Sequence, residues 1–193
     1  MDVVERVLRG SAKDVPYMVR GGRSYLAKIP TRYMKVLSVA VPEFFAVDAS
    51  DWNVLVWSPE HAATLLALLQ KAFKLAKRAV TVVDTSTPDI RRKALVCGDR
   101  QVANILDGST SAVGNMDADC GPSVLEKGIK YSSLCDCLYQ LNRALSSTTF
   151  AKREKTSVRC RVILNAYRDG LIAAASTPRL KSVVETVARA LTG

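Results

Sequence analysis

Three hydroxyl–proline pairs constrain the fold of this chain most, because each joins a helix-capping residue to the residue best suited to start a helix. The pairs are Ser58-Pro59, Thr87-Pro88 and Thr177-Pro178. A hydroxyl caps a free backbone N–H, and proline at the first helical position loses no hydrogen bond. The pairs therefore predict three helices, over residues 59–83, 88–106 and 178–191.

Leucine spacing predicts the other long helices. Leu134, Leu138, Leu141 and Leu145 recur every three to four residues and indicate a helix that starts near Val124. A further helix is expected from Thr148 or Thr149 to about Gly170 or the alanine run at 173–175. The helix over 178–191 carries an apolar stripe of its own, so we expect it to dock either on the core or on a second copy of the chain.

The N-terminal third has a different pattern. A short helix is expected from Asp2 to Leu8, closed by Gly10. Runs of β-branched and aromatic residues at 35–41, 44–47 and 53–57 then predict two or three short strands. The sequence thus predicts a mainly α fold: a helical bundle of about five helices with a small N-terminal β-containing segment. Residues 1–193 are expected to form a single domain, with 1–57 mixed and 58–193 helical.

The net charge of +10 is concentrated in three segments of the 193-residue chain. Residues 15–42 and 70–83 contain basic side chains and no acid, and residues 152–168 contain a single acid, Glu154. Such concentrated positive charge favours binding to a phosphate backbone, because each bound cation releases counterions. Tyr17, Tyr25 and Tyr33 alternate with the first group of arginines, and aromatic rings beside cations suit stacking on single-stranded bases.

These segments supply the candidate nucleic-acid-binding residues. They are Arg20, Arg23, Lys28, Arg32, Lys35, Lys71, Lys74, Arg78, Lys152, Lys155, Arg159 and Arg161. Two trios among them stand at helical i, i+3, i+7 spacing, and we expect the two basic stripes to border one groove.

Residues for catalysis or cofactor binding are not evident. His61 is the only imidazole, and no nucleophile elbow or phosphate-binding glycine loop occurs. The five cysteines are expected to be reduced structural thiols. Asp117 and Asp119 are interpreted as part of a polar loop between residues 108 and 122 rather than as metal ligands. We therefore expect no enzyme activity, no catalytic residue, no metal and no cofactor.

The hypothesis that follows is a non-enzymatic, self-associating protein of the coat or nucleocapsid type that binds nucleic acid, with RNA favoured, and forms a homo-oligomer through 178–191. One alternative is a helical module that binds acidic proteins. Others are an RNA-binding silencing suppressor and a matrix-type protein at a membrane surface. No apolar run is long enough to span a bilayer, and the N-terminal segment lacks a signal-type apolar region. The expected location is therefore cytoplasmic, or within a virion.

Overall fold

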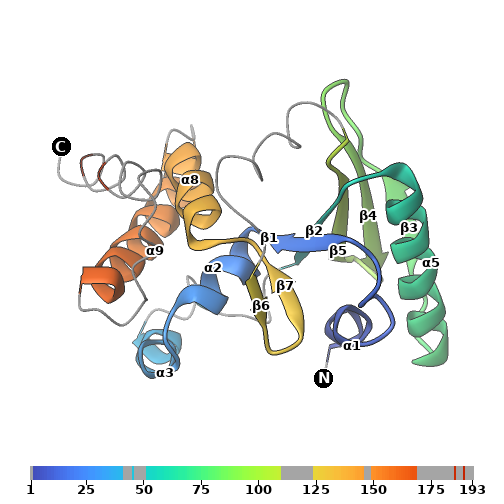
Figure 1. The fold of residues 1–193 in the computed structure, drawn as a ribbon, viewed down its shortest axis with the longest axis horizontal. Helices are drawn as coiled ribbons and strands as arrows, with labels where there is room; N and C mark the ends of the chain where they lie inside the picture. The colour runs from blue at the N-terminus through green and yellow to red at the C-terminus, as the bar shows by residue number, and fades with distance from the viewer. Residues whose placement is uncertain are drawn as a thin grey trace.

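The computed structural model describes residues 2–40, 45, 51–109, 124–145, 149–168, 185 and 189. These residues fold around one seven-stranded mixed sheet with the strand order β3-β4-β5-β2-β1-β7-β6 (Figure 1). The strands are β1 (Tyr17–Arg20), β2 (Trp52–Val56), β3 (Thr81–Asp84), β4 (Arg91–Cys97), β5 (Arg100–Asp107), β6 (Val124–Glu126) and β7 (Ile129–Tyr131).

The centre of the sheet is built from strands that are far apart in the sequence. Strand β2 pairs with β1 in the antiparallel sense and with β5 in the parallel sense. Arg20 therefore lies opposite Asn53, which in turn lies opposite Asn104. This register brings the end of β1, the start of β2 and the first half of β5 to one place.

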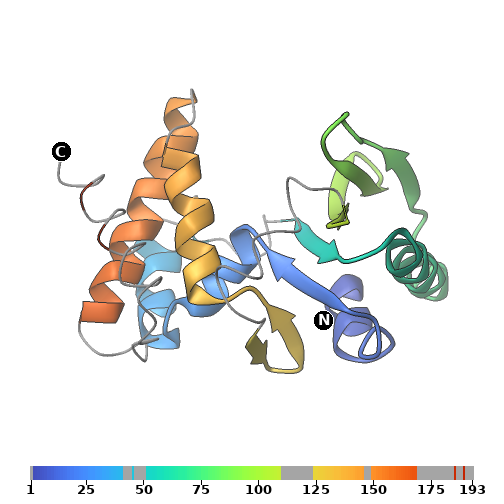
Figure 2. The same cartoon turned by 45° about the horizontal axis from the view of Figure 1, so that its top comes forward.

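Six helices of the described chain lie in two groups. They are α1 (Val3–Arg9), α2 (Gly22–Lys28), α3 (Thr31–Ala40), α5 (Pro59–Leu75), α8 (Leu134–Leu145) and α9 (Phe150–Arg168). Helices α1 and α5 lie beside the sheet, whereas α2, α3, α8 and α9 form a separate lobe at the opposite end of the molecule (Figures 1 and 2).

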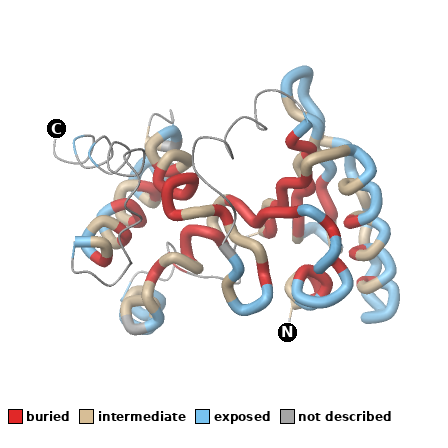
Figure 3. Tube along the Cα trace, in the orientation of Figure 1, coloured by how far each residue is buried: buried red, intermediate tan, exposed pale blue. Residues whose placement is uncertain are grey.

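Each lobe has its own apolar core. The first core joins α1 and α5 to the sheet and contains Val54, Leu65 and Ile105, each no more than 1% exposed. The second core, around Leu138 and Ile163, lies between the helices of the other lobe. Figure 3 shows the buried positions running through both lobes and along the central strands.

The predicted helical bundle is wrong, chiefly because residues 88–106 form a β-hairpin. Gly98 adopts a left-handed φ of 60°, and with Asp99 it makes a two-residue turn that pairs Cys97 with Arg100. Glycine–aspartate turns of this kind match the twist of two antiparallel strands. Thr87-Pro88, which resembled a helix start, is instead part of a tight turn in which Thr87 and Ile90 exchange backbone hydrogen bonds of 2.8 and 3.2 Å.

The first hydroxyl–proline pair does start a helix. The Ser58 side chain accepts a hydrogen bond of 3.2 Å from the backbone N–H of His61, and α5 begins at Pro59 as predicted. The helix ends at Leu75 rather than near Val83, because Lys77 takes a left-handed φ of 55° that a helix cannot continue through. Strand β3 occupies the remainder of the predicted helix.

Of the other predicted elements, some are confirmed and some are wrong. The predicted helix at the N-terminus, the strand at 53–57, the leucine stripe of α8 and the helix after Thr149 are confirmed as α1, β2, α8 and α9. The strand predicted at 35–41 is wrong, since α3 covers those residues up to Ala40. The helix predicted from Val124 begins only at Leu134, after the β6–β7 hairpin.

Several predictions fall outside the described residues. They are the helix over 178–191, the strand over 44–47 apart from Phe45, which has helical backbone conformation, and the loop with Asp117 and Asp119. In the described part of the chain, no helix is both long and apolar enough to cross a membrane.

Candidate functional site

A cluster of polar side chains lies where β1, β2 and β5 meet. Asp51 comes directly before β2, and Asn53 lies on the same face because side chains alternate along a strand. The Asp51 carboxylate accepts hydrogen bonds from Asn104 at 2.6 Å, from Gln101 at 2.7 Å and from Asn53 at 3.3 Å. The Asn104 amide also donates to the Asn53 oxygen at 3.1 Å. We call these four residues the amide cluster.

The turn after β1 closes over this cluster. Gly21 has a left-handed φ of 69°, and a Cβ atom built there would lie 3.2 Å from Nδ2 of Asn53. Any L-residue would therefore combine an unfavourable backbone conformation with a tight contact. Glycine at this position lets the start of α2 approach the amide cluster.

The chemistry of the amide cluster is that of hydrogen bonding. It holds one carboxylate and three side-chain amides, and the carboxylate is already bonded to all three. Metal centres for phosphoryl transfer use several carboxylates to hold magnesium. Across the described ranges, no group of three or more His, Cys, Asp or Glu side chains is placed to hold a metal ion.

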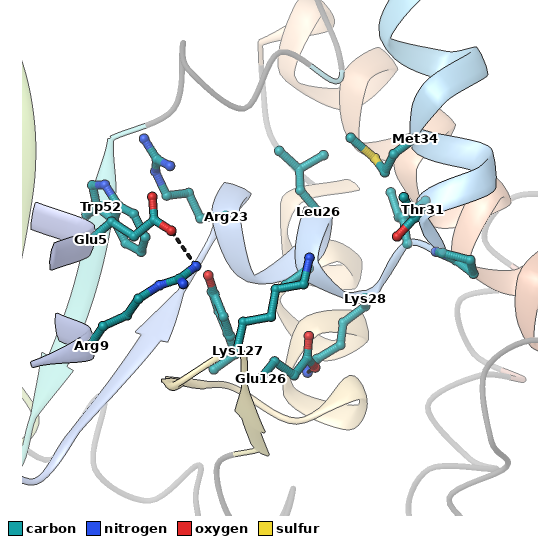
Figure 4. Close-up of a pocket in the computed structure, with 14 residues that line it drawn as sticks. Glu5, Arg9, Arg23, Leu26, Lys28, Thr31, Met34, Trp52, Glu126 and Lys127 are labelled. Carbon is teal, nitrogen blue, oxygen red and sulfur yellow. Dashed lines mark hydrogen bonds and ion pairs between the residues drawn. The ribbon is translucent and has the colours of Figure 1, made fainter. Parts of the chain in front are cut away.

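A cavity of about 620 Å³ lies near Trp52, whose side chain points to the other face of β2 from Asp51 and Asn53 (Figure 4). Its walls come from α1, from α2 and the start of α3, and from the β6–β7 turn. Glu5 and Arg9 form an ion pair of 2.5 Å at one side of it. Lys28 pairs with Glu126 at another.

The first group of predicted binding cations is largely engaged within the fold. Arg20 forms a buried ion pair with Asp136 at 2.7 Å. Arg23 pairs with Asp2 at 3.2 Å and lies 4.1 Å from the centre of the Trp52 ring. Together with the Lys28–Glu126 pair, these contacts tie distant segments to one another. Lys35 is exposed on α3, and only the backbone of Arg32 is described.

The second group is different, because its cations are exposed. Lys71 and Lys74 of α5 and Arg78 just beyond it all face solvent, and Lys77 joins them. No described carboxylate lies within ion-pair distance of any of the four, which we call the α5 cations. Three of them, Lys74, Lys77 and Arg78, line a shallow hollow of about 350 Å³.

The third group is mixed. Arg159 is buried in α9, with its guanidinium 5.9 Å from the centre of the Tyr25 ring. Burial, and then the neighbouring Arg159 charge, lower the pKa of the half-buried Lys155. Arg161 is exposed, and of Lys152 only the backbone is described. Because α5 and α9 lie at opposite ends of the molecule, the two basic stripes do not border a shared groove (Figures 1 and 2).

Sequence reasoning missed the amide cluster, although a local signal was present. The pattern Asp51-x-Asn53 at the start of a β-run places two polar side chains on one face of a strand that is otherwise apolar. A Gly-Gly pair follows β1, where a sharp turn is needed. What no local pattern gives is the contribution of Gln101 and Asn104, which depends on the parallel pairing of β2 with β5.

Comparison with known proteins identifies a relative in fold only. No protein-family model matches the chain, and no curated protein matches it. Among solved structures, the fold is similar to the crystal structure of the Megavirus polyadenylate synthase, with a TM-score of 0.55 over 86% of this chain and 14% identity. The match covers 30% of that chain, so this protein spans less than a third of the structure it resembles.

Proposed function

We propose that this protein binds single-stranded polynucleotide through the α5 cations and does not itself transfer nucleotides. The observation that carries the proposal is the division of the basic residues into two classes. Arg20, Arg23 and Lys28 are held by carboxylates inside the fold, whereas the α5 cations are exposed and have no carboxylate beside them among the described residues.

The surface chemistry of the α5 cations fits a phosphate backbone. Four charges within eight residues, the last two beyond the helix end, give a compact electropositive surface. Each neutralised phosphate releases condensed counterions, which is the main source of sequence-independent affinity for nucleic acid. The lysines present mobile point charges that suit contacts to phosphate rather than to particular bases.

The fold relationship supports a nucleic-acid partner. The Megavirus protein is named a polyadenylate synthase, and the product in that name is a polynucleotide. Among the described residues, the amide cluster offers one carboxylate, and three amides already donate hydrogen bonds to it, which favours binding over transfer. Two-metal phosphoryl transfer depends on carboxylates that are available to magnesium.

The proposed assembly of the protein rests on other residues. Self-association through residues 178–191 lies outside the described part of the chain and stays a prediction. Coat or nucleocapsid function requires that association, whereas strand binding by the α5 cations does not. We therefore propose polynucleotide binding by the single chain first.

The test is a salt titration of oligonucleotide binding. The variant K71Q/K74Q/K77Q/R78Q should bind a labelled single-stranded oligonucleotide more weakly. The dependence of log K on log salt should become shallower by about three, since each contact to single strands contributes roughly 0.7 to that slope. Fluorescence anisotropy at several salt concentrations measures both quantities.

A charge-matched variant distinguishes this surface from net charge alone. Arg143, Arg153, Arg161 and Arg168 are exposed on α8 and α9, at the other end of the molecule. R143Q/R153Q/R161Q/R168Q removes the same charge and should leave affinity nearly unchanged. Equal losses in the two variants would refute the proposed surface. A wild-type protein that binds polyglutamate but no oligonucleotide would refute polynucleotide binding and favour an acidic protein partner.

A further inference from the structure

We infer that the cavity of Figure 4 binds a nucleoside phosphate, at a site separate from the α5 cations. The cavity volume of about 620 Å³ lies within the range of small-molecule sites. This inference goes beyond the proposed function and uses none of the α5 cations.

The charge of the cavity favours an anion. Four cations and two carboxylates line it, and Asp2 bonds one of those cations, Arg23. The wall therefore keeps a net positive charge even when Asp2 is counted. Lys127 is exposed at the tip of the β6–β7 turn, with no described carboxylate in ion-pair contact. Its side chain lies between Arg9 and Lys28 in the view of Figure 4.

Arg9 can also reach an anion at low cost. Its partner Glu5 stands one helical turn away, and both side chains are partly exposed, at 37% and 26%. An exposed pair of this kind contributes little net stability, so a phosphate can compete with the carboxylate. A guanidinium binds phosphate through two parallel hydrogen bonds. Lys127 and Arg9 are thus the proposed phosphate ligands.

Planar groups in the wall of the cavity favour an aromatic ring in the ligand. The Arg23 guanidinium lies 4.1 Å from the centre of the buried Trp52 ring, and both residues line the cavity. Bases stack on guanidinium planes and on aromatic rings. Tyr131 adds a second aromatic surface to the cavity wall, and burial raises the pKa of its phenol to about 12.

The opposite wall is apolar. Leu26, Ile29, Pro30 and Met34 line it, and Figure 4 shows Leu26 and Met34 on the side away from Arg9. An apolar wall, a stacking surface and a cationic rim together match a base joined to a phosphate. A free inorganic phosphate would leave the apolar wall unused, and an uncharged nucleoside would leave the rim unused.

The left-handed lysines of the chain provide a matched pair of variants. Lys127 has φ 49° and Lys77 has φ 55°, and both are exposed. Asparagine tolerates this conformation, so K127N and K77N each remove one charge without backbone strain. The first alters the cavity, and the second alters the α5 cations.

The experiment is calorimetric titration of the full chain with AMP, adenosine and inorganic phosphate. We expect AMP to bind more tightly than either of its parts, and K127N to weaken AMP binding by about tenfold, the loss of one charge-assisted hydrogen bond. K77N should leave AMP affinity unchanged. AMP binding no tighter than that of adenosine and phosphate, or unaffected by K127N, would overturn the inference.

Two further arms complete the experiment. The first identifies the source of the ligand, and the second distinguishes failure of the cavity site from failure of the proposed polynucleotide surface. If a 5′-phosphorylated oligonucleotide displaces AMP, the ligand is the end of a strand. If it does not displace AMP, the ligand is a free nucleotide. Either result supports the site. Oligonucleotide affinity that falls with K77N while AMP binding is absent would leave the proposed function standing and refute the cavity site alone.

Discussion

Arg20 and Asp136 join the two lobes of the molecule through a buried, two-point ion pair. Nε of Arg20 donates to one carboxylate oxygen at 3.2 Å and a terminal nitrogen donates to the other at 2.7 Å. The two side chains are only 10% and 4% exposed, and 116 residues separate them in sequence. The contact links the last residue of β1 to the first turn of α8.

Removing one partner of this pair should destabilise the fold strongly. D136A leaves the Arg20 charge buried without its counter-ion, and such losses cost about 3–5 kcal/mol. Chemical denaturation followed by circular dichroism measures the change in the free energy of unfolding. E5A, which breaks the exposed pair with Arg9, is the control and should cost no more than about 1 kcal/mol. Similar losses in both variants would contradict a structural role for Arg20.

This pair also shows why the sequence misled the assignment of binding residues. Arg20 stands in a segment without acids, and local charge counting predicts that such a cation is available to phosphate. Its counter-ion lies on a helix that folding brings alongside, so the neutralisation is invisible in the local sequence. The α5 cations stood in an equally acid-free segment and did stay exposed. Local composition could not separate the two cases, because the difference lies in tertiary packing.

Helix prediction failed for a related reason. Ser58-Pro59 and Thr87-Pro88 offer the same capping chemistry, yet only the first begins a helix. After Pro59 the chain runs through alanine and leucine without a turn signal, whereas Gly98-Asp99 interrupts the second segment at the point where a hairpin can fold back. The glycine turn and the pairing of β4 with β5 outweigh the cap. In this segment the hairpin turn, and not the helix cap, determines the structure.

The amide cluster should respond to a single change of one amide to a carboxylate. N104D would place a second carboxylate where the Asn104 amide now donates to Asp51 at 2.6 Å, in a position only 5% exposed. Two adjacent carboxylates repel each other, so that either one of them takes up a proton or the fold loses stability. The expected loss at neutral pH is about 2 kcal/mol, comparable with a broken buried hydrogen bond.

A divalent cation should reverse that loss. With two carboxylates and the Asn53 oxygen close together, the variant offers the oxygen ligands that magnesium prefers. Millimolar magnesium is expected to raise the melting temperature of N104D and leave the wild type unchanged. N104A, which removes the same hydrogen bonds without adding charge, is the control. A magnesium response in the wild type would show that the Asp51 carboxylate is available to a metal ion in the native protein.

Asp84 provides a test at acid pH. Hydrogen bonds from the Ser86 side chain and backbone, and then from the Lys93 side chain, lower the pKa of Asp84 from 3.8 to about 2. A carboxyl group whose pKa is lowered by folding stabilises the fold above its ordinary pKa, and that contribution disappears as the pH falls from about 4 to 2. Carboxyl-carbon NMR should show the Asp84 titration midpoint near 2. S86A should raise it more than K93A does, and the reverse order would contradict the assignment of Ser86 as the principal cause.

At alkaline pH the buried thiols should limit stability. Burial raises the pKa of Cys137 to about 11 and that of Cys160 to about 12, both from 9.0. The folded state therefore favours the protonated thiol, so the associated stability is complete below pH 9 and is lost as the pH rises from 9 to 12. Each fully shifted group contributes a slope of up to about 1.4 kcal/mol per pH unit in that interval.

Replacing Cys160 isolates one of these contributions. C160A should flatten the decline of the free energy of unfolding between pH 9 and 12, although the smaller side chain lowers stability at every pH. The control is I163V, which trims the same core without removing a titratable group. It should shift the whole curve downward and keep its shape. A decline of the same steepness in C160A and I163V would show that the Cys160 thiol does not ionise on unfolding, and the burial argument for that residue would fail.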